Sequence, residues 1–331
     1  MTENGGYKLE FLQEINGELS QIESIIIEKL KSDVHTVTDV SLYILKAGGK
    51  RLRPALVILS ALCCGYDKDI ARLIDIAPVV EMIHMATLMH DDVIDGAESR
   101  RGFITANTHW GNLVSVLTGD YVVAKAFWML ANYGNTEMMR ALAASTIAMA
   151  EGELMQIEAK GDIGRLISSY FSIIEGKTAH FMSVCCRIGA IGASAPKEYE
   201  DALESYGRNL GVAFQITDDI LDMVGDPLVI GKPVGGDIRE GKVTLPVILT
   251  LERVDASVKR TIEEIINKDD ASDEEIDFIR RTAESTSAVD SSRETAARYI
   301  LQAARALDAL PDTRFRASLR DLAEYILSRD K

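Results

Sequence analysis

Apolar residues recur at every third or fourth position along most of this chain of 331 residues. Because an α-helix has about 3.6 residues per turn, this spacing places apolar side chains on one helical face. One stripe near the start contains Leu9, Leu12, Ile15, Leu19, Ile22 and Ile26, and one at the end contains Phe315, Leu319, Leu322 and Ile326. The sequence has no alternating strand pattern bounded by hairpin turns. The pattern predicts an all-α protein.

Capping signals indicate where two of the helices begin. Ser194 stands shortly before Pro196, and proline is favoured in the first turn of a helix. Ser272 and Glu275 have the spacing of a capping box ahead of Ile276. We therefore expect one helix to start near Pro196 and another directly after Ser272.

Three segments are apolar on several sides, which is typical of helices at the centre of a large bundle. These segments are 76–89, 113–131 and 138–155. The chain ends and the stretch 259–298 are more polar, as expected for peripheral helices. No linker rich in Pro, Gly or Ser divides the chain, so we expect a single domain over residues 1–331.

The composition indicates a globular protein that does not bind nucleic acid. Hydrophobic residues make up 47% of the chain and charged residues 26%, as in folded globular proteins. The 51 Asp and Glu residues outnumber the 36 Lys and Arg residues, which gives a formal net charge of −15. Nonspecific binding to nucleic acid depends instead on basic residues that meet phosphates.

The cysteines and the N-terminus indicate a cytoplasmic location. Cys63–Cys64 and Cys185–Cys186 lie in apolar stretches without metal-ligand spacing, so we expect buried thiols, which suit a reducing compartment. The N-terminus lacks the pattern of a signal peptide. The least polar stretch, 54–66, is shorter than the roughly 20 residues of a membrane span, so we expect no transmembrane segment.

Two short strings share the pattern Asp-Asp-x-x-Asp. They are Asp91-Asp92-Val93-Ile94-Asp95 and Asp218-Asp219-Ile220-Leu221-Asp222. Residues four apart share a helix face, and their like charges repel each other unless a cation lies between them. Clustered oxygen ligands without His or Cys select hard ions, so both strings predict Mg²⁺ binding, completed by water and ligand phosphates. Two solvated acidic turns would be the simpler interpretation, but both strings lie within apolar helix sequence.

Basic residues gather next to these features despite the acidic surplus. The glycine-rich segment Gly48-Gly49-Lys50-Arg51-Leu52-Arg53-Pro54 contains three cations, and Arg100-Arg101-Gly102 follows the first aspartate string closely. Cations beside metal-binding carboxylates predict a site for a phosphorylated anion, because arginine and lysine bind phosphate oxygens. The alternative is a set of scattered surface arginines.

These strings together resemble those of the trans-type polyprenyl diphosphate synthases. The resemblance is carried by GGKRLRP, HDDVID with RRG behind it, EGKTAHF, FQITDDILD and GKPVGGDIREGKVTLP, in the family's order and from about residue 40 to residue 250. Within the family, the chain is most similar to long-chain members such as octaprenyl and heptaprenyl diphosphate synthases. The resemblance implies a single all-α bundle of the isoprenoid synthase type around a deep central cavity, and a homodimer.

The resemblance also implies which residues bind the substrates, isopentenyl diphosphate and an allylic diphosphate. Asp91, Asp95 and Asp218 would bind the Mg²⁺ ions that clamp the allylic diphosphate, and Asp92, Asp219 and Asp222 would ligate or support them. Lys50, Arg53 and His84 match positions that hold isopentenyl diphosphate. His84 lies seven positions, or about two helical turns, before Asp91, which points it along the same face, although a lone His in an apolar helix is more often a core residue.

The remaining matches surround the leaving group. Arg100 matches the contact to the allylic diphosphate and Arg101 the contact to the homoallylic one; Lys177, Thr178, Gln215 and Lys232 match residues around the allylic leaving group, and Lys242 lies in the same glycine-rich segment as Lys232. We expect the segment from Gly231 to Gly241 to be a mobile flap that closes over the reaction.

Residues that precede Asp91 on its helix descend from the metal site at about 1.5 Å per residue. Thr87, Ala86, Ile83 and Val80 would then line the path of the growing product. In short-chain relatives an aromatic residue at the positions of Ala86 or Thr87 blocks this path. Since none of the four is aromatic here, the sequence predicts a long-chain product, unless Ala86 simply packs against a neighbouring helix.

Other functions remain to be weighed against this prediction. A terpene cyclase would share the fold and one aspartate string, but it normally lacks GGKRLRP and the second string. A noncatalytic subunit of a heteromeric synthase usually loses one string or the basic anchors, and this chain keeps both. A short-chain farnesyl or geranylgeranyl diphosphate synthase, one subunit of a heteromeric synthase, and a nonenzymatic Mg²⁺-dependent phosphate-binding bundle remain as alternatives.

Overall fold

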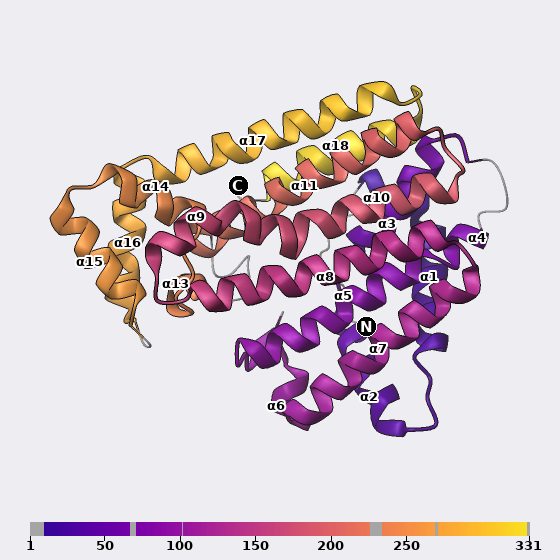
Figure 1. Cartoon of the computed structure of the whole chain (residues 1–331), viewed down its shortest axis with the longest axis horizontal. Coiled ribbons are helices and arrows are strands. Elements are labelled where there is room, and N and C mark those ends of the chain that lie inside the picture. The colour runs from indigo at the N-terminus through magenta and orange to yellow at the C-terminus, as the bar shows by residue number, and fades with distance from the viewer. Residues whose placement is uncertain (1–9, 67–70, 101, 226–233, 269–270, 330–331) are drawn as a thin grey trace. The chain divides into compact units, whose positions relative to one another are not determined.

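The protein is described by a computed structural model that covers residues 10–66, 71–100, 102–225, 234–268 and 271–329. Most of these residues lie in helices, which confirms the predicted all-α class (Figure 1). In chain order the elements are η1 (Glu10–Ile15), α1 (Asn16–Lys29), α2 (His35–Lys46), α3 (Leu52–Cys63), α4 (Ala71–Ile74), α5 (Ala77–Ile94), β1 (Ser99–Arg100), β2 (Phe103–Ile104), α6 (Ala106–Trp110), α7 (Asn112–Tyr133), α8 (Thr136–Ala159), α9 (Ile163–Ile174), η2 (Glu175–Ala179), α10 (His180–Gly192), α11 (Lys197–Val224), α13 (Gly236–Arg239), α14 (Leu245–Arg253), α15 (Ala256–Ile266), α16 (Asp273–Ser285), α17 (Ala288–Ala306), η3 (Leu307–Ala309) and α18 (Arg314–Ser328). The element η2 is a π-helical turn, and η1 and η3 are 3₁₀ turns.

The chain forms two compact units, each assembled from separate segments. Unit 1 comprises Met1–Ala141, Cys185–Leu203 and Leu307–Leu322, and unit 2 comprises Leu142–Val184, Glu204–Ala306 and Ala323–Lys331. Because neither unit is a continuous stretch of sequence, this division does not describe two consecutive domains. A single domain over residues 1–331 stays a prediction.

Unit 1 is organised around α5, which packs against α3 and α7. Its residues from Ala77 to Ile83 are buried on every side of the helix, as its sequence predicted. Close packing within this unit depends on small residues. A side chain at Gly119 of α7 would lie 2.3 Å from His90 Nε2 on α5, and one at Gly189 of α10 would lie 2.3 Å from the Val57 carbonyl oxygen on α3.

The helices α7 and α8 differ from the prediction that they are buried on all sides. On α7 the side chains of Leu113, Leu117 and Trp128 are exposed, and on α8 those of Ile147 and Leu154. In α7, Val122, Ala126 and Leu130 do enter the core, so the helix has one packed face and one apolar face at the surface. An apolar periphery and a buried centre have the same composition, which is why sequence could not separate them.

Helix α7 is long and apolar enough to qualify as a candidate membrane span. Asn112–Tyr133 contains an 18-residue window with a mean hydropathy of 1.4, of which 33% is buried in the protein. This helix is longer than the apolar stretch 54–66, on which the expectation of no membrane span was based. The expectation of a protein without a transmembrane segment therefore stays a prediction.

Unit 2 has a core formed mainly by apolar residues of α9, α11 and α14–α17. Fully or nearly buried examples are Ile216 and Ile220 on α11, Val247 on α14, Ile262 on α15 and Ile279 on α16. Ile216 and Ile220 are interspersed along α11 with the aspartates of the second string, Asp218, Asp219 and Asp222. Burial of Ile216 and Ile220 therefore determines how the second aspartate string is oriented.

Local signals were largely confirmed. Ser272 and Glu275 form the predicted capping box at the start of α16, and α11 begins directly after Pro196. A minimal antiparallel pair of two-residue strands, β1 and β2, joins Ser99 to Ile104 and Arg100 to Phe103, which the helical pattern had not indicated. The four cysteines are free thiols; Cys63, Cys185 and Cys186 are buried as expected, and Cys64 is half-buried. Burial raises the pKa of Cys64 and of Cys186 to about 12.

Candidate functional site

Both aspartate strings lie at the C-terminal ends of long helices. Asp91, Asp92 and Asp95 occupy the end of α5, and Asp218, Asp219 and Asp222 the end of α11. The helix dipole places partial negative charge at a C-terminus, so acidic residues are unfavourable there and basic ones are preferred. Neither described helix has a basic residue in its last turn. This arrangement opposes helix stability twice, through the dipole and through like-charge repulsion, and a bound cation would relieve both.

The three carboxylates of the first string differ in exposure. Asp95 is exposed and Asp91 half-buried, whereas Asp92 is 1% exposed. The Asp92 Oδ1 oxygen accepts a hydrogen bond from Arg100 Nε at 2.7 Å. Burial raises the pKa of Asp92, and the charge of Arg100 partly opposes that shift. Asp92 thus supports the string from inside the fold, and Arg100, expected to contact the allylic diphosphate, is bound to a carboxylate in this conformation.

The basic turn before α3 divides its three cations between two roles. Lys50 is exposed and Arg53 is half-buried in the first turn of α3, and their substrate-binding role stays a prediction. Arg51 has a left-handed backbone, with φ 50°, and points into unit 1. Its guanidinium binds Glu81 Oε1 at 2.9 Å, Glu23 Oε1 at 2.8 Å and the Leu45 carbonyl oxygen at 3.0 Å. Arg51 is therefore a structural residue that fixes the turn, and not a third cation of an anion site.

Replacing Arg51 with methionine is expected to destabilise the protein by about 3–5 kcal/mol, because the carboxylate of Glu81, 4% exposed, would lose its partner inside the fold. Urea denaturation at neutral pH measures this loss. Glu23→Gln is the matched control, since Glu23 is 46% exposed and its removal should cost no more than about 1 kcal/mol. Equal losses for the two variants would contradict the assignment.

The three carboxylates of the second string also differ in exposure. Asp218 is half-buried, and its Oδ1 oxygen lies 3.0 Å from Arg329 Nη1. The same guanidinium stacks on the ring of Phe214, 4.7 Å from its centroid. Phe214 and Asp218 are four residues apart on α11, so Arg329 covers one face of that helix. The sequence analysis did not identify Arg329, because a single arginine near the C-terminus has no motif around it.

Asp219 is buried and engaged through both of its oxygens. Tyr170 on α9 donates its hydroxyl to Asp219 Oδ2 at 2.5 Å, and Gln215 Nε2 donates to Oδ1 at 3.1 Å. Burial raises the pKa of Asp219 to about 7, against the lowering effect of these two hydrogen bonds. Both oxygens of Asp219 thus accept hydrogen bonds inside the fold, an arrangement that suits a supporting role.

Asp222 stabilises the backbone of the glycine-rich segment at Gly235 and Asp237. Its Oδ2 oxygen accepts the Asp237 N–H at 2.9 Å, and its carbonyl oxygen accepts the Gly235 N–H at 2.7 Å. Gly235 has φ 80° and lies so close to Ile276 that a side chain there would be 2.4 Å from Cγ2. Arg239 also binds the Ala271 carbonyl oxygen at 2.6 Å. Residues 234–241 thus contact α11 and α16 in this conformation; residues 231–233 lie outside the described part of the chain, and the mobile flap stays a prediction.

The π-helical turn η2 presents Lys177 and Thr178. Three glycines allow backbones to approach it: a side chain at Gly152 would lie 3.1 Å from the Lys177 nitrogen, one at Gly176 2.8 Å from the Ala148 carbonyl oxygen, and one at Gly211 2.5 Å from Ala179 Cα. Such π turns are rare and occur frequently at functional sites. The irregular turn is thus held tightly by helices α8 and α11.

Lys177 is held by two residues of α8 that the sequence analysis missed. Its ammonium forms an ion pair with Glu153 and a hydrogen bond with Gln156 Oε1 at 3.1 Å. Thr178, 8% exposed, donates its hydroxyl to Gln215 Oε1 at 2.9 Å. Glu153 and Gln156 lie among other charged residues of α8, such as Glu151 and Glu158, so the sequence offered no signal that set them apart. The structure brings together Lys177, Thr178 and Gln215, three of the four residues predicted around the leaving group.

Two predicted residues, Arg101 and Lys232, lie outside the described part of the chain. His84 is half-buried on α5, and Lys242 forms an ion pair with Glu240. Of the predicted chain-length residues, Val80, Ile83 and Ala86 are fully buried, and half-buried Thr87 donates its hydroxyl to the His84 carbonyl oxygen at 2.8 Å. Burial is compatible with an enclosed product path and equally with helix packing.

No preformed metal cage is present among the described residues, where no three His, Cys, Asp or Glu side chains converge on one point. The donor chemistry nevertheless fits Mg²⁺. Asp95 is exposed and Asp91 and Asp218 are half-buried, with one Asp218 oxygen paired to Arg329, whereas Asp92 and Asp219 are buried and engaged inside the fold. Mg²⁺ usually keeps several waters and takes one or two carboxylates together with substrate phosphates, so it does not require a cage of protein ligands.

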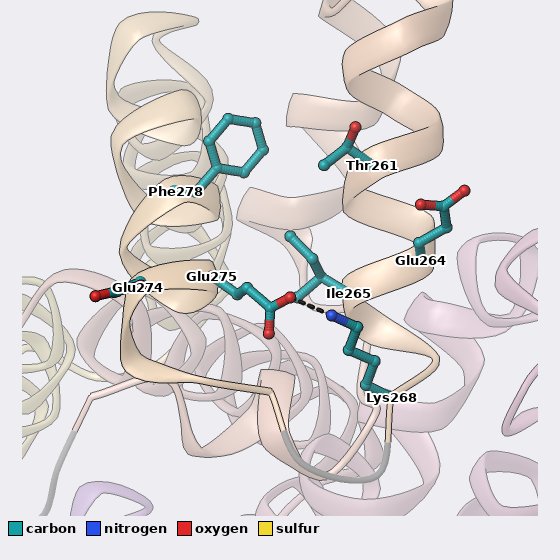
Figure 2. Close-up of a pocket in the computed structure, with 7 residues that line it drawn as sticks. All are labelled: Thr261, Glu264, Ile265, Lys268, Glu274, Glu275 and Phe278. Atoms are coloured by element: carbon teal, nitrogen blue, oxygen red, sulfur yellow. Dashed lines mark hydrogen bonds and ion pairs between the residues drawn. The ribbon is translucent and has the colours of Figure 1, made fainter.

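A groove between α15 and α16 contains none of the predicted site residues. Figure 2 shows it lined by Thr261, Glu264, Ile265, Lys268, Glu274, Glu275 and Phe278, with an ion pair between Lys268 and Glu275. The pair joins the two helices on the solvent side. We assign this groove no part in the chemistry.

This chain is similar to known proteins along nearly all of its length. Residues 34–282 match the sequence profile of the family described as polyprenyl synthetase. Component 2 of the heptaprenyl diphosphate synthase of Geobacillus stearothermophilus is 36% identical over 316 residues, which cover 96% of this chain and 97% of that protein. The crystal structure of a decaprenyl diphosphate synthase from Rhodobacter capsulatus superposes with a TM-score of 0.91, at 36% identity, over 97% of this chain and 99% of that one. A polyprenyl synthase from Caulobacter crescentus CB15, solved with calcium and isoprenyl diphosphate, has a TM-score of 0.91, at 32% identity, over 98% of each chain.

Proposed function

This chain belongs to the polyprenyl synthetase family, and we propose that it condenses isopentenyl diphosphate with an allylic diphosphate to make a long all-trans polyprenyl diphosphate. It is a trans-prenyltransferase. The observation that carries the proposal is the pair of Asp-Asp-x-x-Asp strings, each at the C-terminal end of a helix where acidic residues are otherwise unfavourable.

In this proposal the less buried members of the two strings bind the metal. Asp91, Asp95 and Asp218 hold Mg²⁺, while Asp92, Asp219 and Asp222 hold the strings in place from inside the fold. When bound, the ion supplies positive charge that stabilises the diphosphate leaving group. The calcium in the Caulobacter crescentus relative supports a divalent cation, and the choice of Mg²⁺ rests on the all-oxygen donor set.

The basic residues position the two diphosphates. Lys50, Arg53 and His84 bind isopentenyl diphosphate, Arg100 and Arg101 assist at the two diphosphates, and Lys177, Lys232 and Lys242 face the leaving group. Once the allylic C–O bond breaks, the double bond of isopentenyl diphosphate attacks the allylic cation, and loss of a proton gives the new trans double bond. The released diphosphate is the base we propose, because no side chain has an evident claim to that role.

The experiment that tests the proposal is product analysis. Purified full-length protein is incubated with Mg²⁺, isopentenyl diphosphate and, separately, geranyl, farnesyl or geranylgeranyl diphosphate, and the products are measured by mass spectrometry. We expect six to ten isoprene units in the product. No condensation by the chain alone, followed by activity when a partner subunit is added, would make it one subunit of a heteromeric synthase, as the relative named component 2 allows.

We also propose that the protein is a homodimer joined through α7. Its exposed face carries Leu113, Leu117, Ala124 and Trp128, with Asp120 at the middle. If two copies of α7 pack antiparallel, Leu113 of one copy lies opposite Trp128 of the other, and Leu117 lies opposite the small Ala124. The large and small side chains would then interdigitate. A two-fold interface requires this kind of self-complementary surface.

The substitution Leu117→Glu is expected to convert the dimer to a monomer, because it places a charge at the centre of the proposed apolar interface. Sedimentation velocity of the full chain at micromolar concentration measures the change. Glu137→Lys, on the exposed surface of α8, is the control and should leave the dimer intact. A wild-type monomer that binds vesicles would show instead that the α7 face contacts a membrane.

A cytoplasmic location is the last part of the proposal. It is supported by four free cysteines, three of them buried, in a chain that would function in a reducing compartment without disulfides.

A further inference from the structure

A chain of three hydrogen bonds in unit 2 connects Tyr170 to the π-helical turn. Tyr170 Oη donates to Asp219 Oδ2 at 2.5 Å. Gln215 Nε2 donates to Asp219 Oδ1 at 3.1 Å, and Thr178 Oγ1 donates to Gln215 Oε1 at 2.9 Å. Tyr170 belongs to α9, Asp219 and Gln215 are one turn apart on α11, and Thr178 belongs to η2. The network therefore joins three elements of the same unit.

The directions of these bonds follow from which groups donate and which accept. Tyr170 and Asp219 are each 4% exposed and Thr178 is 8% exposed, so water offers little competition for their polar atoms. Each oxygen of Asp219 accepts one hydrogen bond, one from the Tyr170 hydroxyl and one from the Gln215 amide, and both bonds favour the ionised carboxylate, which cannot donate. Gln215 must then turn its amide nitrogen toward Asp219 and its amide oxygen toward Thr178. Thr178 in turn must place its proton on the side of Gln215.

This network determines the direction in which the lone pairs of Thr178 Oγ1 point. With its proton directed to Gln215, the hydroxyl oxygen presents only acceptor character in its other directions. A hydroxyl free to rotate would offer its proton to those directions part of the time. An allylic cation is stabilised by an oxygen lone pair and destabilised by the positive end of an O–H dipole.

We propose that Tyr170 is a positioning residue, which through Asp219 and Gln215 orients the Thr178 hydroxyl so that its lone pairs face the allylic cation. The inference rests on the proposed function, since it takes Thr178 to lie beside the allylic centre. Tyr170 itself touches no substrate in this scheme. Its role is to donate a hydrogen bond to Asp219 Oδ2, which leaves Oδ1 to accept from Gln215. The side-chain amide of Gln215 then stays in one orientation.

The backbone around Thr178 gives this network a rigid support. The neighbouring Ala179 lies against Gly211 of α11, and Gly176 lies against the Ala148 carbonyl oxygen of α8, both closer than any side chain at the glycines would allow. The turn therefore cannot shift to compensate for a misdirected hydroxyl. Rotation about the Thr178 side chain is the freedom that remains, and the network removes it.

The first test is the single-turnover rate of the first condensation by Tyr170→Phe, which removes one hydroxyl and keeps the ring. We expect about a tenfold fall in that rate, with the affinity for the allylic diphosphate changed less than about twofold, because the lost interaction exists only with the cation. Tyr206→Phe, another fully buried tyrosine of unit 2, is the matched control and should keep the wild-type rate. A wild-type rate for Tyr170→Phe would overturn the inference.

A double-mutant cycle separates positioning from a structural role. Thr178→Val removes the hydroxyl and should lower the rate, whereas Thr178→Ser should restore most of it. In the Thr178→Val background, Tyr170→Phe should have no further effect, since residues that act through one network are not additive. Additive losses, or a Tyr170→Phe defect that disappears when Mg²⁺ is raised, would show that Tyr170 serves the fold or the metal and would overturn the inference.

A binding measurement checks the inference without turnover. An allylic diphosphate analogue with a protonated amine in place of the reacting carbon carries the positive charge of the cation. By calorimetry with Mg²⁺ present, Tyr170→Phe should bind this analogue about tenfold more weakly, and a neutral analogue equally well. Equal loss for both analogues would contradict the inference. Wild-type protein that binds the charged analogue in this way yet forms no prenyl product would refute the proposed function alone.

Discussion

Replacement of Asp91 or Asp218 by alanine is expected to lower the rate of condensation by about a thousandfold or more, while helical circular dichroism is retained. Each variant loses a carboxylate that we propose binds the metal, and electrostatic stabilisation of a leaving group commonly has an effect of about this size. The fold should tolerate the change, because a negative charge is removed from the C-terminal end of a helix.

The measurement is the steady-state rate across a Mg²⁺ titration, with thermal unfolding followed in EDTA. Asp201→Ala is the matched control: Asp201 lies on α11 like Asp218, is exposed and pairs with Lys197 on the surface. It should keep both the rate and the unfolding temperature. Near-normal activity of Asp91→Ala or Asp218→Ala at limiting Mg²⁺ would contradict the metal assignment.

Replacement of Ala86 by tyrosine is expected to shorten the product to farnesyl or geranylgeranyl length while the first condensation is retained. Ala86 is fully buried on α5, about one turn before Asp91, and an aromatic ring there would block the proposed path of the growing chain. Mass spectrometry of products formed with excess isopentenyl diphosphate measures the shift. A wild-type enzyme that itself stops at geranylgeranyl diphosphate would contradict the open path.

A graded series distinguishes a blocked path from damage to the core, since overpacking a buried position costs about 1–3 kcal/mol wherever it occurs. Ile83→Tyr and Val80→Tyr lie progressively further from Asp91 on the same helix, and both positions are fully buried. If these residues line the path, the product should lengthen from Ala86→Tyr through Ile83→Tyr to Val80→Tyr. Loss of activity without such a gradient would assign the three residues to helix packing.

Sequence reasoning was most successful where the physical signal is local. Helical periodicity predicted the all-α class, and the capping box at Ser272 was confirmed because its two partners are three residues apart. The strings at Asp91 and Asp218 were recognisable because like charges at helical spacing are rare without a ligand. The prediction that α7 is a central, buried helix was wrong. An apolar helix face that packs in the core and one that remains at the surface contain the same types of residue, so sequence alone does not distinguish them.

The sequence by itself determined that this protein is helical and that acidic and basic groups suited to Mg²⁺ and diphosphates occur together in one chain. Only the tertiary structure decided which of those groups are engaged inside the fold and which remain available to a ligand. Arg51 binds Glu81, 30 residues away, and so leaves the set of phosphate-binding cations. Asp219 binds Tyr170, 49 residues away, and so supports the string instead of facing solvent. Spacing along a helix specifies which side chains share a face, but burial of that face against another element determines which of them remain available to a ligand.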